Sequence, residues 1–165
     1  MSDESTGSAR LVRFLETSAL IETISAEIYH FLAEAHRDIP EAAALWKKTA
    51  IEEEMHVERF HVAARHCTEL HASARIPQEE ADRVLGRVRE MVEELKRKPP
   101  GVIPALRLVI TMEERLSAFH LENSLEFEDE SIKALFGALL REDRAHIVDL
   151  NTQLAVFLLD APEGN

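Results

Sequence analysis

The chain has 165 residues, 45% of them hydrophobic, and a formal net charge of -12. Its length suits one domain with a continuous core, and the scarcity of Gly (5), Pro (6) and aromatic residues (5%) favours helices over strands. The acidic balance argues against nucleic acid and anionic membranes as partners, since both require a basic patch. The single cysteine, Cys67, excludes an internal disulfide and metal sites built from paired cysteines. Any bound metal is therefore expected to use His and carboxylate ligands.

The start of the chain, MSDESTGSAR, is polar and has no apolar stretch of the kind found in secretory signals. No run of about 18 apolar residues, the length of a membrane-spanning helix, occurs in the sequence. We therefore expect a cytoplasmic protein.

Apolar residues recur at helical spacing through most of the chain. The pattern is broken at Ile39-Pro40, at Ile76-Pro77 and at Pro99-Pro100-Gly101, and the acidic stretch FEDES (127–131) forms a further turn. Five helices are predicted, over about residues 8–37, 40–74, 78–98, 102–127 and 131–159.

The lengths of the breaks predict the topology. Short breaks join the first two helices and the last two, which predicts two antiparallel hairpins, while the charged, amphipathic helix over 78–98 belongs to a long crossover between them. This order favours an all-α, ferritin-like four-helix bundle with one crossover over an up-down-up-down bundle. No flexible linker divides the sequence, so a single domain over residues 1–165 is expected.

An acidic residue followed three positions later by histidine occurs four times. The pairs are Glu27/His30, Glu53/His56, Glu58/His61 and Asp143/His146. This spacing places both side chains on one helical face, but it is too common here to identify a site. Residues seven apart lie on nearly the same stripe of a helix, so an inward side chain should have core-like residues seven positions away on both sides.

This test selects one carboxylate on each of four helices. They are Glu22 (flanked by Leu15 and Tyr29), Glu53 (Trp46 and Phe60), Glu113 (Leu106 and His120) and Asp143 (Phe136 and Leu150). It rejects Glu27 and Glu58, which have Glu34 and Arg65 on their stripes. Four carboxylates and two histidines are thus expected to converge in the core.

Buried carboxylates at one level require compensating positive charge. Two divalent cations supply it when carboxylates bridge them and His56 and His146 each bind one. The alternative is a hydrogen-bonded salt network without metal, and the absence of Arg and Lys from these stripes argues against it.

The two halves of the chain contain a repeat. LWKKTAIEEEMH (45–56) and LFGALLREDRAH (135–146) align without a gap, and Glu22 matches Glu113 one residue out of phase. The repeat predicts a pseudo-twofold axis between the hairpins. His120 occupies the place of Tyr29 in this repeat, and it is an extra ligand, a hydrogen-bond donor to Glu113 or a core histidine; we favour the donor.

With these residues in place, the chain resembles the rubrerythrin branch of the ferritin-like superfamily over nearly its whole length. ETISAEIYHFLAE (22–34) is similar to that family's ligand Glu followed seven residues later by Tyr, and IEEEMH (51–56) is similar to its E-x-x-H motif. The resemblance implies metal ligands at Glu22, Glu53, His56, Glu113 and His146, with Asp143 in a sixth ligand position. It also implies a homodimer, and Tyr29 as a catalytic residue beside the metals.

By the same resemblance, the function is that of a di-iron oxidoreductase. It would reduce hydrogen peroxide, the preferred reaction, or oxidise ferrous iron with dioxygen or peroxide. Three departures bear on this expectation. Asp143 stands where the family has Glu, so Glu142 is an alternative ligand; Leu116 stands where classical members have a second Glu; and no rubredoxin domain is present, so a separate electron-donor protein is expected.

Other functions stay open at this stage. The same ligands serve an iron storage or buffering protein, and a metal-free helical interaction module would use the acidic surface and the segment 78–98 instead. His and carboxylate ligands also accept manganese and other divalent metals, so two iron ions are the preferred cofactor by resemblance.

Overall fold

The computed structural model describes residues 2–66, 77–127 and 129–160, and every regular element among them is a helix. The helices are α1 (Ser2–Ala35), α2 (Pro40–His66), α3 (Gln78–Arg97), α4 (Val102–Glu126) and α5 (Glu130–Asp160). The prediction of an all-α chain is therefore confirmed for this part of the sequence.

The breaks before α2, α4 and α5 lie where the sequence predicts them. Pro40 begins α2, and Gly101 directly precedes α4. In the acidic turn, Oδ1 of Asp129 accepts hydrogen bonds from the backbone N–H groups of Ser131 and Ile132, both at 2.9 Å. Asp129 thus caps the first turn of α5, which otherwise would leave these N–H groups without partners.

One helix boundary differs from the prediction, and the structure does not describe another. α1 begins at Ser2 rather than near residue 8, because apolar spacing marks only the packed part of a helix and no proline precedes that part. The predicted second helix continues to about residue 74, but 67–76 lie outside the described residues.

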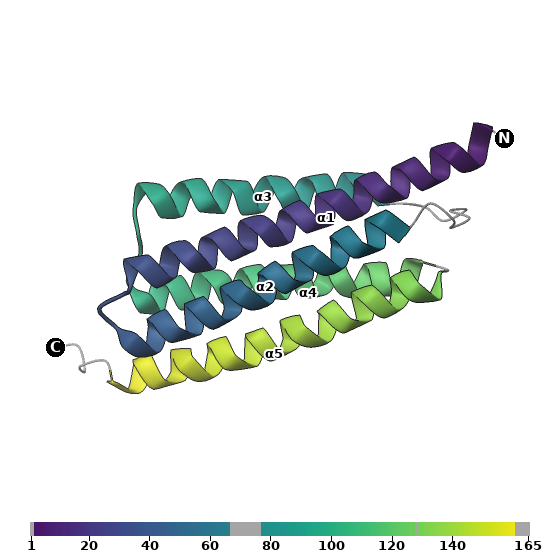
Figure 1. Cartoon of the computed structure of the whole chain (residues 1–165). Coiled ribbons are helices and arrows are strands. Elements are labelled where there is room, and N and C mark those ends of the chain that lie inside the picture. The colour runs from purple at the N-terminus through teal and green to yellow at the C-terminus, as the bar shows by residue number, and fades with distance from the viewer. Residues whose placement is uncertain (1, 67–76, 128, 161–165) are drawn as a thin grey trace.

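Figure 1 shows α1 and α2 as one antiparallel pair and α4 and α5 as a second pair beside it. α3 runs along the outside of α1 and carries the chain back along the molecule from the end of α2 to the start of α4. The order of elements is that of two hairpins joined by a helical crossover.

An apolar face holds α3 in place. Its buried residues are Ala81, Val84, Leu85, Val88, Val92 and Leu95. Polar contacts with α1 are few and exposed: Gln78 Nε2 donates to Thr17 Oγ1 at 3.0 Å, and Arg13 lies 3.9 Å from Asp82. Exposed ion pairs contribute little, so burial of the apolar face is the main attachment.

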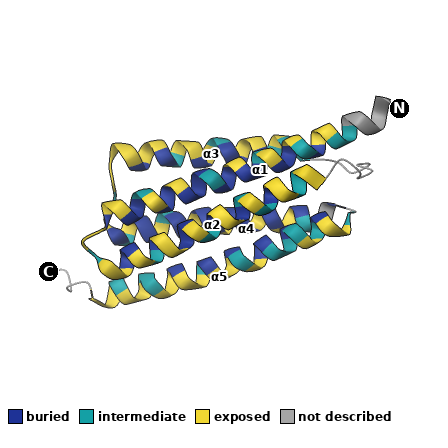
Figure 2. Ribbon diagram, in the orientation of Figure 1, coloured by how far each residue is buried: buried dark blue, intermediate teal, exposed yellow. Residues whose placement is uncertain are grey.

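The inner faces of the helices form continuous buried stripes, as Figure 2 shows. Five phenylalanine rings form one aromatic cluster, with ring centroids 5.5 to 6.4 Å apart for the pairs in contact: Phe14, Phe60, Phe119, Phe127 and Phe136. Tyr29 and Trp46 stack with centroids 6.0 Å apart elsewhere in the core. Trp46 and Phe60 precede and follow Glu53 by seven residues on α2, so the aromatic groups flank the level of Glu53 on both sides.

Among the helices described, none has both the length and the apolar character needed to span a membrane.

Candidate metal centre

The four carboxylates selected by the heptad test lie in the core. Glu22, Glu53, Glu113 and Asp143 are at most 1% exposed. The rejected Glu27 and Glu58 are exposed on the same helices, α1 and α2. Stripe position therefore separates inward from outward carboxylates in this chain, which the acidic-x-x-His spacing alone does not.

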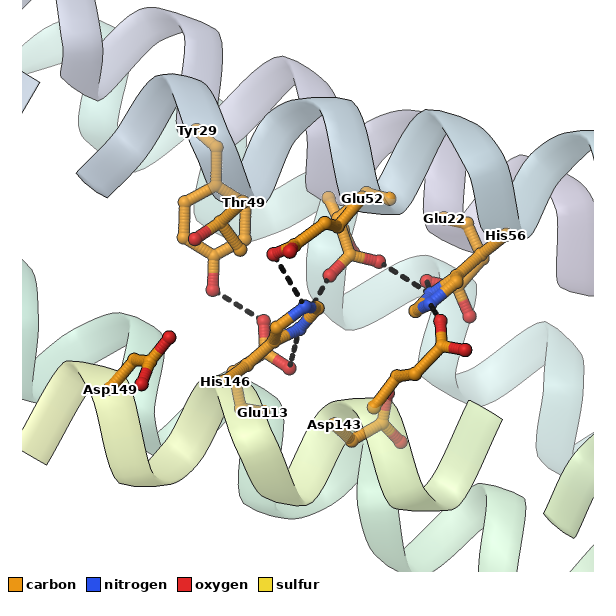
Figure 3. A network of polar contacts seen from close by, with 12 residues as sticks. Glu22, Tyr29, Thr49, Glu52, His56, Glu113, Asp143, His146 and Asp149 are labelled. Atoms are coloured by element: carbon orange, nitrogen blue, oxygen red, sulfur yellow. Dashed lines mark hydrogen bonds and ion pairs between the residues drawn. The ribbon is translucent and has the colours of Figure 1, made fainter. Parts of the chain in front are cut away.

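Two sets of buried side chains have the donors for a metal ion. One consists of Glu22, Glu53 and His56, the other of Glu53, Glu113 and His146, and within each set the ligand atoms lie within 4.8 Å of one another. Glu53 belongs to both sets. Two adjacent cations with one shared carboxylate would need this arrangement. Glu22, His56, Glu113 and His146, which Figure 3 labels, come from four different helices.

The two oxygens of Glu53 face different histidines. Oε2 lies 3.1 Å from His56 Nδ1, and Oε1 lies 3.1 Å from His146 Nδ1. The outer carboxylates complete each set: Glu22 Oε2 is 3.9 Å from His56 Nδ1, and Glu113 Oε2 is 3.5 Å from His146 Nδ1. Each histidine thus presents Nδ1 to the centre.

The other nitrogen of each histidine meets a carboxylate nearer the surface. His56 Nε2 lies 2.7 Å from Glu142 Oε2, and His146 Nε2 lies 3.1 Å from Glu52 Oε2. Arg59 Nη1 donates to the second oxygen of Glu142 at 2.7 Å. Such partners fix the plane of an imidazole and the tautomer that binds a metal. Glu142, the alternative to Asp143 as a ligand, is thus engaged with the outer face of His56.

The sequence did not single out Glu52. A signal was present, because the gapless repeat pairs Glu52 with Glu142, each directly before a selected carboxylate. Each of them partners the histidine of the opposite hairpin.

Tyr29 and His120 also reach across between hairpins. The Tyr29 hydroxyl donates a short hydrogen bond to Glu113 Oε1. His120 lies with Nε2 3.0 Å from Glu22 Oε1 and with Nδ1 2.6 Å from Asp143 Oδ2. The expectation that His120 donates to Glu113 was wrong, because seven residues rise about 10.5 Å along a helix and bring a side chain level with the ligand of the neighbouring helix instead.

Asp143 is buried beside the two metal-binding sets but belongs to neither. Its contact in the core is His120. Of the six predicted metal ligands, the structure therefore brings five into the two overlapping sets and places the sixth next to them.

Several atoms at the centre have no partner in hydrogen-bonding geometry among the residues that the structure describes. Besides Glu52 Oε2 and His120 Nε2, they are five atoms of the expected metal ligands: both oxygens of Glu22, Glu53 Oε1, Glu113 Oε2 and His146 Nδ1. Buried polar groups normally have partners, and leaving one without costs about 1 to 3 kcal/mol. These five atoms are of the types that bind divalent metals in proteins, so the residues present fit a pair of such ions.

Proximity of the carboxylates changes their pKa values. Burial and the charge of Glu113 raise the pKa of Glu53 to about 8. Burial likewise raises the pKa of Glu113, although its contacts with His146 oppose the shift. For Glu22 the opposing interactions win: burial favours the neutral acid, but the imidazoles of His120 and His56 lie close to its oxygens and lower its pKa below the usual range.

The three imidazoles respond to the same negative charge. Burial lowers their pKa values, but neighbouring carboxylates outweigh it and raise them, to about 12 for His56, about 10 for His120 and about 11 for His146. Without cations, the centre therefore retains protons on its histidines. The carboxylates create a demand for positive charge that protons or metal ions can meet.

The centre approaches solvent between α2 and α5. A surface hollow of about 250 Å³ is lined there by Glu52, Glu142 and His146, with Lys48 and Arg59 among the other residues at its wall. Lys48 Nζ lies 3.5 Å from Glu52 and 2.7 Å from Asp149. His146, whose Nδ1 faces the core carboxylates, is thus also a wall residue of this hollow.

The sequence matches no protein-family model, no curated protein and no solved structure. The resemblance to rubrerythrins therefore stays a prediction, and the description of the centre depends on its residues and geometry alone.

Proposed function

We propose that this chain is a cytoplasmic, ferritin-like protein that binds two metal ions, preferably iron, and acts as a di-iron oxidoreductase. Reduction of hydrogen peroxide is the preferred reaction, with oxidation of ferrous iron as its variant. The observation that carries the proposal is Glu53, whose two oxygens face His56 and His146 in two overlapping ligand sets.

The donor set supports a dinuclear site over a single ion. Each position offers one imidazole nitrogen, one carboxylate of its own and one oxygen of Glu53. Oxygen and imidazole donors of this kind suit Fe(II), and they also accept Mn(II) and other divalent ions. A bound pair of iron ions would supply two electrons to a peroxide or dioxygen molecule.

The protein's own groups would bring the oxidant in and provide protons. The hollow between α2 and α5 has room for a small oxidant next to His146. Tyr29 holds a proton at its hydroxyl, directed at Glu113, because burial and the charge of Glu113 raise the pKa of this phenol well above its usual value. A proton held at this atom is available to a leaving oxygen, which is the role proposed for Tyr29.

Two further parts of the proposal concern partners. A separate electron-donor protein is proposed from the family resemblance, to return electrons to the centre in repeated turnover. A homodimer is proposed from the family resemblance. Exposed apolar side chains on α2 and α5 support it: Ile51 is 55%, Met55 51% and Val148 63% exposed.

The test is a peroxide challenge of protein loaded anaerobically with Fe(II). The wild type should consume about one peroxide per pair of iron ions, seen as loss of ferrous iron and growth of near-ultraviolet absorption. Glu53→Gln should lose this reaction, whereas Glu58→Gln, an exposed change five residues along α2, should keep it.

The size of the loaded particle separates the alternatives. A dimer that turns over peroxide supports the enzyme, whereas a large shell that accumulates many iron ions per chain would identify a storage protein. A wild type that folds and binds no metal would refute the proposal and favour the metal-free interaction module.

A further inference from the structure

The two halves of the centre agree at most of their matched positions. Each half contributes one carboxylate from its first helix, Glu22 or Glu113, and one histidine from its second, His56 or His146. Each also contributes an outer carboxylate, Glu52 or Glu142, to the histidine of the other half, a contact type shared by both halves. Two matched positions near the carboxylates and histidines differ: Asp143 stands in place of Glu53, and His120 stands in place of Tyr29.

The two exceptions touch each other. His120 Nδ1 lies 2.6 Å from Asp143 Oδ2. Tyr29 has one polar side-chain atom and uses it on Glu113, so it has none left for a second carboxylate. An imidazole has two nitrogens, and the second one, Nε2, lies 3.0 Å from Glu22 Oε1. His120 therefore connects Asp143 to Glu22.

The ring of His120 is held where it stands. It is fully buried, and the rings of Phe60, Phe119 and Phe136 lie around it with centroid distances of 6.3, 5.7 and 5.8 Å. Aromatic packing on this scale leaves an imidazole little freedom to turn away from its two carboxylates.

We propose that His120 and Asp143 form a positioning pair that makes the two metal positions unequal. Asp143 does not bind metal; it holds His120, and His120 orients Glu22 toward the position that Glu22 shares with His56. Glu53 is then the single bridging carboxylate. This inference depends on the proposed metal binding. It adds the distinction between the residues that bind the metal ions and the residues that position those ligands.

Three observations favour this over a role for Asp143 as a second bridge. Asp143 is absent from both sets of converging ligand atoms, although it is as buried as Glu53. Its side chain is one methylene shorter than that of its counterpart. Its oxygen Oδ2 is engaged by Nδ1 of His120, whereas Glu53 Oε1 has no partner in hydrogen-bonding geometry among the described residues.

The test is an anaerobic titration of metal-free protein with Co(II), followed by visible absorption and by equilibrium dialysis. The wild type should bind two Co(II) in two resolved steps. Glu22→Gln and Glu113→Gln should each remove one step and so assign it, while Glu27→Gln, an exposed change on α1, should alter neither.

His120→Phe should weaken the Glu22 step by about tenfold or more, as loss of an outer partner that orients a ligand typically does, and should leave the Glu113 step nearly unchanged. Asp143→Asn should weaken the same step alone. In the double variant the two effects should not add, because both act through one contact. His120→Tyr, which copies Tyr29, should recover most of the lost affinity, a result that a merely structural role would not give.

Other outcomes overturn the inference and are distinguishable from failure of the proposed function. If Asp143→Asn weakens both steps, or does so equally in the His120→Phe background, Asp143 is a bridging ligand and the inference is wrong while metal binding stands. If the wild type binds no Co(II), the proposed function fails first and this inference with it. Thermal unfolding by circular dichroism checks that each variant folds, and His120→Gln replaces His120→Phe if the latter does not.

Discussion

The hydroxyl of Tyr29 on α1 donates a hydrogen bond to Glu113 on α4, so the two hairpins are joined through the centre itself. The reciprocal contact runs from His120 on α4 to Glu22 on α1. Each of the two helices thus carries a carboxylate facing the centre and, seven residues later, a side chain that holds the other helix's carboxylate.

Replacing Tyr29 with Phe tests this contact. The change leaves Glu113 Oε1 buried without its donor, so the metal-free protein should lose about 1 to 3 kcal/mol of unfolding free energy, measured by urea denaturation. Two metals should still bind, and the reaction with peroxide should slow. Unchanged peroxide kinetics at full metal content would remove Tyr29 from the proposed chemistry.

Glu53→Gln should abolish both metal positions together, because the two ligand sets share this side chain. Glu22→Gln and Glu113→Gln should each affect one position. Metal content after dialysis, measured by elemental analysis, distinguishes the two patterns. Loss of only one ion in Glu53→Gln would mean that Glu53 does not bridge.

The stability of the metal-free protein should fall as pH rises above neutrality. The pKa values of His56, His120 and His146 are raised to about 12, 10 and 11, so the stability they contribute is fully present below their unfolded pKa of 6.5 and is lost as pH rises through the folded values. The pKa of Glu53, raised to about 8 from an unfolded value of 4.5, acts in the same direction, because the stability it contributes is lost as pH rises between these two values.

Glu22 acts in the opposite direction, because its lowered pKa contributes stability above 4.5 that is lost as pH falls. Denaturation midpoints measured from about pH 5 to pH 10 should therefore decline on the alkaline side for metal-free protein. Metal-loaded protein should decline less, because cations replace the protons. A midpoint that rises steadily with pH in the metal-free protein would contradict the assigned shifts.

Asp129→Ala tests the cap of α5 independently of the centre. Loss of the two hydrogen bonds to the first turn should cost about 1 kcal/mol of unfolding free energy and leave metal content unchanged. Glu130→Ala is a neighbouring control, since its side chain is exposed and pairs only with Lys133 among the contacts described.

Much of this arrangement could be predicted from the sequence. The seven-residue stripes of Glu22, Glu53, Glu113 and Asp143 identified the inward carboxylates. Residues seven apart lie on nearly the same stripe of a helix, and the stripe that faces the core is mostly apolar. The prolines at 40, 77 and 99–100 predicted the breaks, because proline cannot continue a helix from the preceding turn.

Contacts across the bundle could not be predicted in the same way. A stripe indicates the direction in which a side chain points but not the axial register between two helices. Register decides that His120 meets Glu22 and Asp143 rather than Glu113, and that Glu52 meets His146. It is set by the packing of many core side chains, which no single motif encodes.

The most direct test of the central claim is anomalous X-ray diffraction from crystals of the protein loaded anaerobically with iron. The account predicts two anomalous peaks in the core, one beside His56 and one beside His146, with the carboxylate of Glu53 between them. A single peak, a pair of peaks elsewhere, or no peak in the core of crystals saturated with iron would contradict it.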